Sequence, residues 1–131
     1  MKSRMADAIL DASAALAVLQ DERGADVVRD WHERALLTSV NASEVVVKLI
    51  RYGAAPEAAQ TLVRMLGSEI VDVDANLGLQ AGALYARTSH AGLSLGDRIC
   101  LALALREGLP VLTADRAWAS LDIGVEIRLI R

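Results

Sequence analysis

The sequence has no phenylalanine, and aromatic residues make up only 3% of its 131 positions. Because hydrophobic residues still reach 53%, the core must be built from Ala, Leu, Val and Ile, and the composition excludes a disordered chain. The single cysteine, Cys100, excludes an internal disulfide and a cysteine-based zinc site. A lone thiol fits a reducing compartment, so we expect a cytoplasmic protein.

Long apolar runs are also absent. The longest segment without a charged residue, residues 75–86, falls well short of the roughly 20 apolar residues of a membrane-spanning helix. Asp7 and Asp11 interrupt the N-terminal apolar stretch, which argues against a secretion signal, and we expect no membrane association. The length suits one domain, and neither a repeat nor a Pro/Gly/Ser-rich linker divides the chain. We therefore expect a single domain over residues 1–131.

Apolar periodicity predicts alternating strands and helices. The expected strands cover residues 5–10, 36–40, 69–73, 110–113 and 125–130. The expected helices cover residues 12–20, 27–35, 41–53, 56–67, 76–90, 97–108 and 116–121, and residues 98–106 are apolar enough for a helix buried on all sides. This alternation predicts an α/β fold: a three-layer α/β/α sandwich whose central sheet of four to five strands is mostly parallel.

Acidic residues stand where ligands collect in such a fold, just beyond the carboxyl ends of the strands. Asp11 follows the first strand, Glu44 lies in the first turn of the helix after the second, and Asp115 comes two residues after the fourth. Asp97 opens the buried helix. Four carboxylates at one edge would repel one another unless a cation lay between them. Oxygen ligands favour Mg²⁺ or Mn²⁺.

Helix capping explains the same acids in a plainer way. Residues 41–44 (NASE) and 94–97 (SLGD) both resemble capping boxes, and Asp115 is placed to cap the short helix that follows it. Asp11 is also placed to cap the helix that begins at Ala12 or Ser13. From the residues alone, capping and metal binding both stay open.

The other catalytic motifs that we considered are incomplete in this sequence. Residues 92–96 (GLSLG) match the nucleophile elbow of serine hydrolases, but His32 and His90 both precede Ser94, whereas that fold places its histidine last. The sequence has neither the glycine fingerprint of dinucleotide binding nor a P-loop lysine.

Four strings taken together resemble one known family. ILDASAALAVL, NASEVVVKL, LSLGDRICLALAL and PVLTADRAW occur in this order from Ile9 onward, and they are similar to the PIN-domain ribonucleases, in particular the VapC toxins of bacterial type II toxin–antitoxin systems. The resemblance implies a PIN-like fold. It also implies that Asp11, Glu44, Asp97 and Asp115 form an acidic cluster that holds one or two Mg²⁺ or Mn²⁺ ions.

The resemblance assigns supporting roles as well. Ser13 and Thr113 match hydroxyl positions that orient the acidic cluster through hydrogen bonds. Arg98 is a candidate contact to RNA phosphate or a partner of a neighbouring acid. Arg116 stands beside Asp115, where some family members carry a further acid, which leaves the second metal ion open.

The activity implied by the resemblance is an endoribonuclease that hydrolyses an RNA phosphodiester through metal-bound water. Asp11, Asp97 and Asp115 would be ligands, and Glu44 either a ligand or the group that orients the water. The implied partners are RNA, a VapB-type antitoxin and a second copy of the chain. The apolar stripe of residues 44–67 suits a partner helix or a dimer contact, or simply covers the sheet.

Net charge does not contradict an RNA substrate. The formal charge is −3, but without the four proposed ligands thirteen acids face fourteen basic residues. Two other classes of function remain as alternatives. One is a receiver-like phosphoacceptor domain, which fits less well because no lysine follows Lys48. The other is a non-catalytic binding module in which the acids only cap helices.

Overall fold

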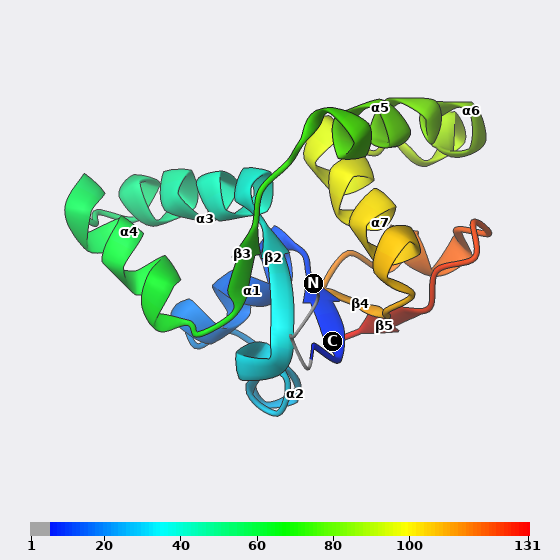
Figure 1. Cartoon of the computed structure of the whole chain (residues 1–131). Helices are drawn as coiled ribbons and strands as arrows, with labels where there is room; N and C mark the ends of the chain where they lie inside the picture. Colours follow the sequence, from blue (N-terminus) through cyan, green and yellow to red (C-terminus); the bar gives the residue numbers. More distant parts are fainter. Residues whose placement is uncertain (1–5) are drawn as a thin grey trace.

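The computed structural model describes residues 6–131, and its centre is a parallel five-stranded sheet (Figure 1). The strands lie in the order β3-β2-β1-β4-β5, and every neighbouring pair is parallel. The strands are β1 (Ala8–Leu10), β2 (Ala35–Thr38), β3 (Glu69–Val71), β4 (Val111–Thr113) and β5 (Ile127–Leu129). This order differs from the 2-1-3-4-5 order of flavodoxin-like receiver domains, which disfavours the phosphoacceptor alternative.

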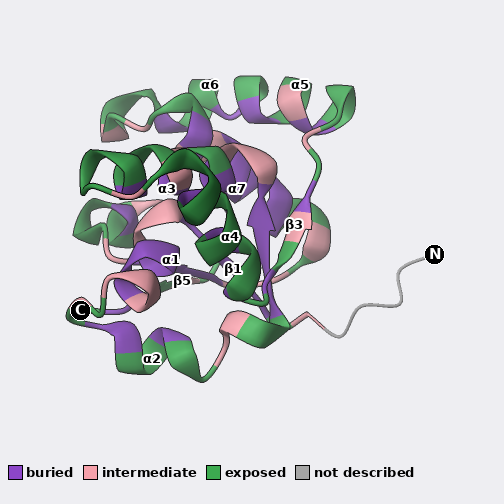
Figure 2. Cartoon of the chain, turned by 90° about the vertical axis from the view of Figure 1, so that its left-hand side faces the viewer, coloured by how far each residue is buried: buried purple, intermediate pink, exposed green. Residues whose placement is uncertain are grey.

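Helices cover both faces of the sheet, so the expected three-layer α/β/α fold is confirmed (Figures 1 and 2). The α-helices are α1 (Ala12–Leu19), α2 (Ala25–Arg29), α3 (Ser39–Arg51), α4 (Pro56–Met65), α5 (Ala75–Ala83), α6 (Tyr85–Thr88) and α7 (Leu95–Glu107). The described residues also form the short 3-10 helices η1 (His32–Arg34), η2 (Ser89–Ala91) and η3 (Arg116–Ser120). No helix within residues 6–131 is long and apolar enough to cross a bilayer.

Two apolar clusters hold the layers together because successive strand residues point to opposite faces of the sheet. Leu10 and Leu112 pack with α1, α3 and α4 on one face. Ile9 and Val111 pack with α5 and α7 on the other face. The expectation that α7 is buried on all sides is confirmed over residues 99–104, all of which are buried.

Two local boundaries differ from the sequence expectations in the kind of element formed. Helix α3 begins at Ser39, within the expected strand 36–40, because Thr38 caps it by accepting a hydrogen bond from the backbone N–H of Asn41 at 2.9 Å. The single helix expected over residues 76–90 is divided into α5, α6 and η2, with the first break directly after Ala83.

The other differences shorten the predicted elements. The strands are three or four residues long, and Met5, at the start of the first expected strand, lies outside the described residues. The helix expected over residues 27–35 becomes α2 and η1, and Ala35 opens β2.

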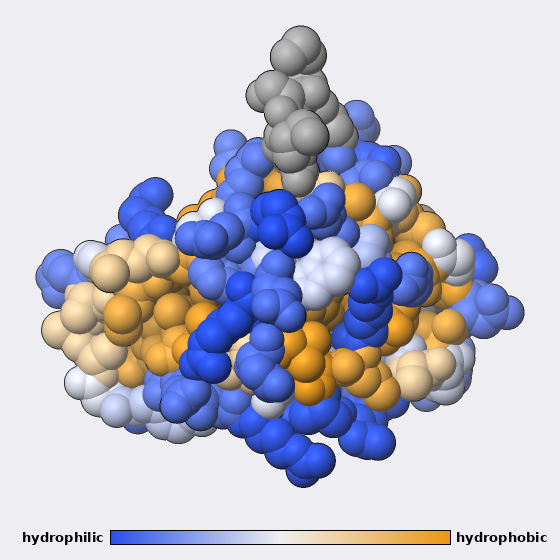
Figure 3. Space-filling model, turned by 90° about the horizontal axis from the view of Figure 1, so that it is seen from below, coloured by the Kyte–Doolittle hydropathy of each residue, from blue (hydrophilic) through white to orange (hydrophobic). Residues whose placement is uncertain are grey.

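The hairpin of α3 and α4 leaves apolar side chains on the surface. Figure 3 shows apolar surface on the side of the molecule where this hairpin lies. Val47, Ile50 and Met65 of the hairpin are exposed. The hairpin also lies beside the carboxyl ends of β1 and β2, where the predicted acidic residues gather.

Candidate active site

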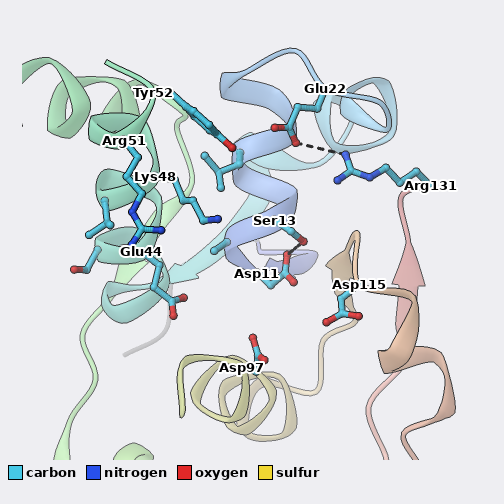
Figure 4. Close-up of a pocket in the computed structure, with 14 residues that line it drawn as sticks. Asp11, Ser13, Glu22, Glu44, Lys48, Arg51, Tyr52, Asp97, Asp115 and Arg131 are labelled. Atoms are coloured by element: carbon cyan, nitrogen blue, oxygen red, sulfur yellow. Dashed lines mark hydrogen bonds and ion pairs between the residues drawn. The ribbon is translucent and has the colours of Figure 1, made fainter. Parts of the chain in front are cut away.

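A single pocket of about 560 Å³ contains all four predicted acidic residues (Figure 4). Asp11 follows β1, Glu44 projects from α3, Asp97 lies in the first turn of α7, and Asp115 follows β4. Because β1 and β4 are adjacent and parallel, the residues that follow them share one edge of the sheet. The pocket therefore brings together side chains from four separated parts of the chain.

Asp11 is the most buried of the four carboxylates, with only 5% of its surface exposed. It caps α1 by accepting a hydrogen bond from the backbone N–H of Ala14 at 2.8 Å. The Ser13 hydroxyl donates to the same carboxylate oxygen at 2.6 Å, and the Thr113 hydroxyl donates to the other. Three donors thus fix both oxygens of a carboxylate that has little contact with solvent.

The same two hydroxyls also accept hydrogen bonds from the backbone after β4. Ser13 Oγ accepts from the N–H of Ala114 at 2.9 Å, and Thr113 Oγ1 accepts from the N–H of Asp115 at 3.0 Å. Both side chains therefore connect the Asp11 carboxylate to the segment that carries Asp115. This hydrogen-bond network fixes Asp11 and Asp115 relative to each other.

Asp97 and Asp115 cap helices and line the pocket at once. Asp97 Oδ2 accepts from the N–H of Ser94 at 3.0 Å in a complete capping box, which confirms the capping expectation for residues 94–97. Asp115 Oδ1 accepts from the N–H of Ala117 at 3.0 Å and caps η3. Among the described residues, the second oxygen of each carboxylate makes no hydrogen bond. Each of these two carboxylates therefore keeps one oxygen available to bind another group.

Glu44 caps no helix, and the capping box expected over residues 41–44 is wrong. Because α3 begins at Ser39, Glu44 lies in its second turn rather than its first. The buried Asn41 side chain instead donates to Glu44 Oε1 at 2.7 Å. Asn41, expected to open the helix, thus holds the Glu44 carboxylate in the pocket.

Gly96 brings α3 and α7 together at the Glu44 carboxylate. A Cβ atom at Gly96 would lie only 2.5 Å from Glu44 Oε2, closer than atoms can approach. Only glycine lets the carboxylate occupy this place beside Asp97. Sequence reasoning did not single out Gly96, because nothing in the sequence shows which helix faces it.

The electrostatics of the pocket show that the negative charges are close together. Burial, and to a smaller extent the charge of Asp97, raise the pKa of Asp11 to about 6, although its three hydrogen bonds act in the opposite direction. Burial also raises the pKa of the Cys100 thiol, and the charges of Asp11, Asp97 and Glu44 raise it further. Among the described residues, none of the four predicted acids forms an ion pair, whereas Glu22, the fifth carboxylate of the pocket, pairs with Arg131 at 3.5 Å.

The donor set suits a hard divalent cation. Within residues 6–131, no three His, Cys, Asp or Glu side chains are close enough to enclose a metal ion by themselves. Mg²⁺ needs no such enclosure, because it retains several waters and binds one or two carboxylates together with phosphate oxygens of a substrate. An open pocket with carboxylate oxygens on several sides fits this mode of binding.

Comparison with known proteins identifies the family. The family model described as "PIN domain" matches residues 8–124. The chain belongs to the PIN-domain family. "Ribonuclease VapC42" of Mycobacterium tuberculosis is 32% identical to this PIN domain, over 88% of this chain and 95% of the relative. A "VapC ribonuclease" of Mycobacterium bovis matches with the same identity and coverage, so the chain falls in the VapC group.

Solved structures share the fold. The chain is similar to a DNA-bound VapBC complex from Salmonella typhimurium, with a TM-score of 0.75 and 19% identity over 97% of this chain and all of that one. It is also similar to VapC20 of Mycobacterium tuberculosis, described as a sarcin-ricin loop cleaving toxin, with a TM-score of 0.70 and 19% identity over 92% of this chain and 99% of that one. At such identities these likenesses show the PIN fold alone.

The basic residues that line the pocket of this PIN domain are not the one singled out from the sequence. Arg98 does not line the pocket, and its guanidinium lies over the Tyr85 ring, 5.4 Å from the ring centre. Lys48 and Arg51 of α3 line the pocket instead. Their spacing from Glu44, four and seven residues, places all three on one helix face, and this period was the signal that sequence reasoning missed.

Proposed function

We propose that this VapC-type PIN domain is a Mg²⁺- or Mn²⁺-dependent endoribonuclease that hydrolyses RNA at the acidic pocket. The observation that carries the proposal is the convergence of Asp11, Glu44, Asp97 and Asp115 on one pocket. A binding module whose acids only cap helices has no need of this convergence, and Glu44 caps nothing. The curated relatives named as ribonucleases support the same conclusion.

The four acids take different parts in the proposed reaction. Asp11, Asp97 and Asp115 would hold the cation, one or two of them directly and the rest through its retained waters. Ser13 and Thr113 would keep the Asp11 oxygens oriented. A bound Mg²⁺ or Mn²⁺ lowers the pKa of water and offsets negative charge on the phosphate. Glu44, fixed by Asn41, would either join the ligands or orient the attacking water. No histidine from the described part of the chain lines the pocket, so the proposal requires no imidazole base.

RNA cleavage by matched variants tests this proposal. The purified protein, incubated with total bacterial RNA and MnCl₂, should generate discrete fragments, and EDTA should stop the reaction. Asp97→Asn should lose cleavage at least about a hundredfold, because it removes a proposed ligand while the amide oxygen of Asn can still accept from the N–H of Ser94. Asp74→Asn is the control, because Asp74 caps α5 by accepting from the N–H of Leu77 but does not line the pocket. Equal cleavage by the parent and a folded Asp97→Asn variant would refute the assignment.

A VapB-type antitoxin and a second copy of the chain are the proposed protein partners. Structural neighbours include the VapBC complex from Salmonella typhimurium and a toxin–antitoxin complex from Klebsiella pneumoniae. The exposed apolar side chains of α3 and α4 offer a surface for such a contact. Size-exclusion chromatography with light scattering should show a dimer that binds the product of the adjacent small gene. A protein that stays monomeric and does not bind that product would contradict both proposed partners.

A further inference from the structure

Beyond Glu44, the side of the pocket formed by α3 carries two cations and an aromatic ring. Lys48, Arg51 and Tyr52 of α3 line the pocket, and Figure 4 shows them on the side opposite Asp97 and Asp115. Lys48 and Arg51 lie about one and two turns beyond Glu44 on the same helix face. We call Lys48, Arg51 and Tyr52 the α3 wall.

The side chains of the α3 wall are exposed. Lys48 and Arg51 are both exposed, and Tyr52 is 64% exposed. Among the described residues, neither Lys48 nor Arg51 forms a hydrogen bond or an ion pair, although five carboxylates line the same pocket. The cations are therefore available to an anion that enters from outside.

We propose that the α3 wall binds a single RNA strand next to the cleavage site, with Lys48 and Arg51 contacting phosphates and Tyr52 stacking on a base. This proposal rests on the proposed ribonuclease function and adds how the substrate is held. Cations supply most of the affinity for a nucleic-acid backbone, and exposed aromatic rings bind unpaired bases by stacking. The exposed Val47, between Glu44 and Lys48 in sequence, also lines the pocket and adds apolar surface to it.

The arrangement of charge favours RNA over an acidic protein segment. An RNA strand places phosphates at regular intervals, so one can lie at the cation held by the carboxylates while its neighbours lie at Lys48 and Arg51. An acidic peptide would find only two unpaired cations, because Arg131 of the pocket pairs with Glu22, and it would be repelled by the acids on the other side. The acidic side and the basic side of the pocket thus suit successive phosphates of one strand.

The salt dependence of RNA binding tests the two cations. The full chain carrying Asp97→Asn, which leaves RNA intact, is titrated into a fluorescein-labelled oligoribonucleotide of mixed sequence while anisotropy is recorded at several KCl concentrations. Lys48→Ala and Arg51→Ala should each weaken binding several-fold and reduce the slope of log K against log salt by about 0.7. Arg64→Ala, an exposed arginine on α4 outside this pocket, should change neither quantity. Unchanged affinity and slope for both α3 variants would overturn the proposal.

Stacking by Tyr52 has a different signature. Tyr52→Ala should weaken binding about fivefold or more with no change in the salt slope, and Tyr52→Phe should retain the affinity of the parent. Tyr85→Ala is the control, because Tyr85 is also exposed but contacts Arg98 away from the pocket. Equal losses of RNA affinity for Tyr52→Ala and Tyr52→Phe, or no loss for either variant, would contradict stacking by Tyr52.

Cleavage kinetics separate this proposal from the ribonuclease function itself. If the parent chain cleaves RNA, the Lys48→Ala/Arg51→Ala double variant should raise KM several-fold and leave kcat nearly unchanged. An unchanged KM would refute the α3 wall and leave the ribonuclease function standing, whereas a parent chain that cleaves no RNA would refute the function. Loss of antitoxin binding with RNA affinity retained would identify the wall as a protein contact and overturn the proposal.

Discussion

The buried carboxylate of Asp11 destabilises the metal-free protein when it is charged. Its pKa of about 6 lies above the ordinary value of 3.8, chiefly because burial disfavours the charged form. Between these two values the folded protein holds more protons on this group than the unfolded chain does. The contribution of Asp11 to stability therefore becomes less favourable as the pH rises from about 4 to about 6.

Asp11→Asn should stabilise the metal-free protein at neutral pH while abolishing cleavage. Removal of the buried charge should raise the free energy of unfolding by about 1 to 3 kcal/mol at pH about 7.5, and the gain should shrink toward pH about 4. Urea unfolding in EDTA at several pH values measures the difference. A variant that is less stable than the parent at pH about 7.5 would show that the hydrogen bonds of Asp11, and not its charge, dominate its contribution.

At the residue scale, the sequence was sufficient to predict the acidic residues of the pocket but not the contacts that their neighbours make. Asp11, Asp97 and Asp115 could be found because each follows a strand or opens a helix. The contact of Asn41 with Glu44 could not be found, because it depends on where α3 begins, and Thr38 moves that start by two residues. Arg98 was a candidate for RNA by its place beside Asp97, yet on a helix adjacent residues face different directions.

At the scale of elements, the site depends on how closely α3 approaches α7. Gly96, in the first turn of α7, leaves just enough space for the carboxylate of Glu44. Glu44 has a flexible side chain, so an added methyl group would displace the carboxylate rather than the helices. The effect should fall on catalysis and not on folding.

Gly96→Ala should reduce the rate of RNA cleavage about ten- to a hundredfold, because a misplaced catalytic group loses its geometry. The free energy of unfolding should change by no more than about 1 kcal/mol, since alanine suits a helix better than glycine. The matched control is Gly78→Ala in α5, where an added Cβ meets nothing within 4 Å. That control should keep full activity, and a Gly96→Ala variant with full activity would show that the position of Glu44 is not critical.

The elements themselves were largely predictable, and their ends were not. Every predicted strand and the central helix α7 exist, because apolar periodicity is a property of whole segments. The division of residues 76–90 was missed, although Gly78 and Gly82 weaken a continuous helix there. Boundaries depend on single hydrogen bonds, such as the cap that Thr38 provides to α3.

At the scale of the whole molecule, the charge is distributed unevenly. The chain has a formal charge of −3, but five acids line one pocket, and among the described residues only Glu22 of the five forms an ion pair. The rest of the molecule is nearly neutral, with basic side chains on the α3 wall of the same pocket. A cation bound by the acids would convert the pocket from a site that repels phosphate into one that attracts it.

The parallel topology makes this distribution predictable in part. In a parallel sheet all carboxyl ends meet at one edge, so acids that follow β1 and β4 must be neighbours. The sequence therefore predicted that the four acids lie together. It could not predict the spacing between them, because that is set by the packing of α3 and α7.

The most direct test of the central claim is the cleavage of RNA in living cells. The 5′ ends of cellular RNA are sequenced after brief induction of the parent chain, of Asp97→Asn and of Asp74→Asn. We expect new 5′ ends at a small set of sites with the parent and with Asp74→Asn, and none with Asp97→Asn. Identical new ends with Asp97→Asn, or none with the parent, would contradict the claim that the acidic pocket hydrolyses RNA.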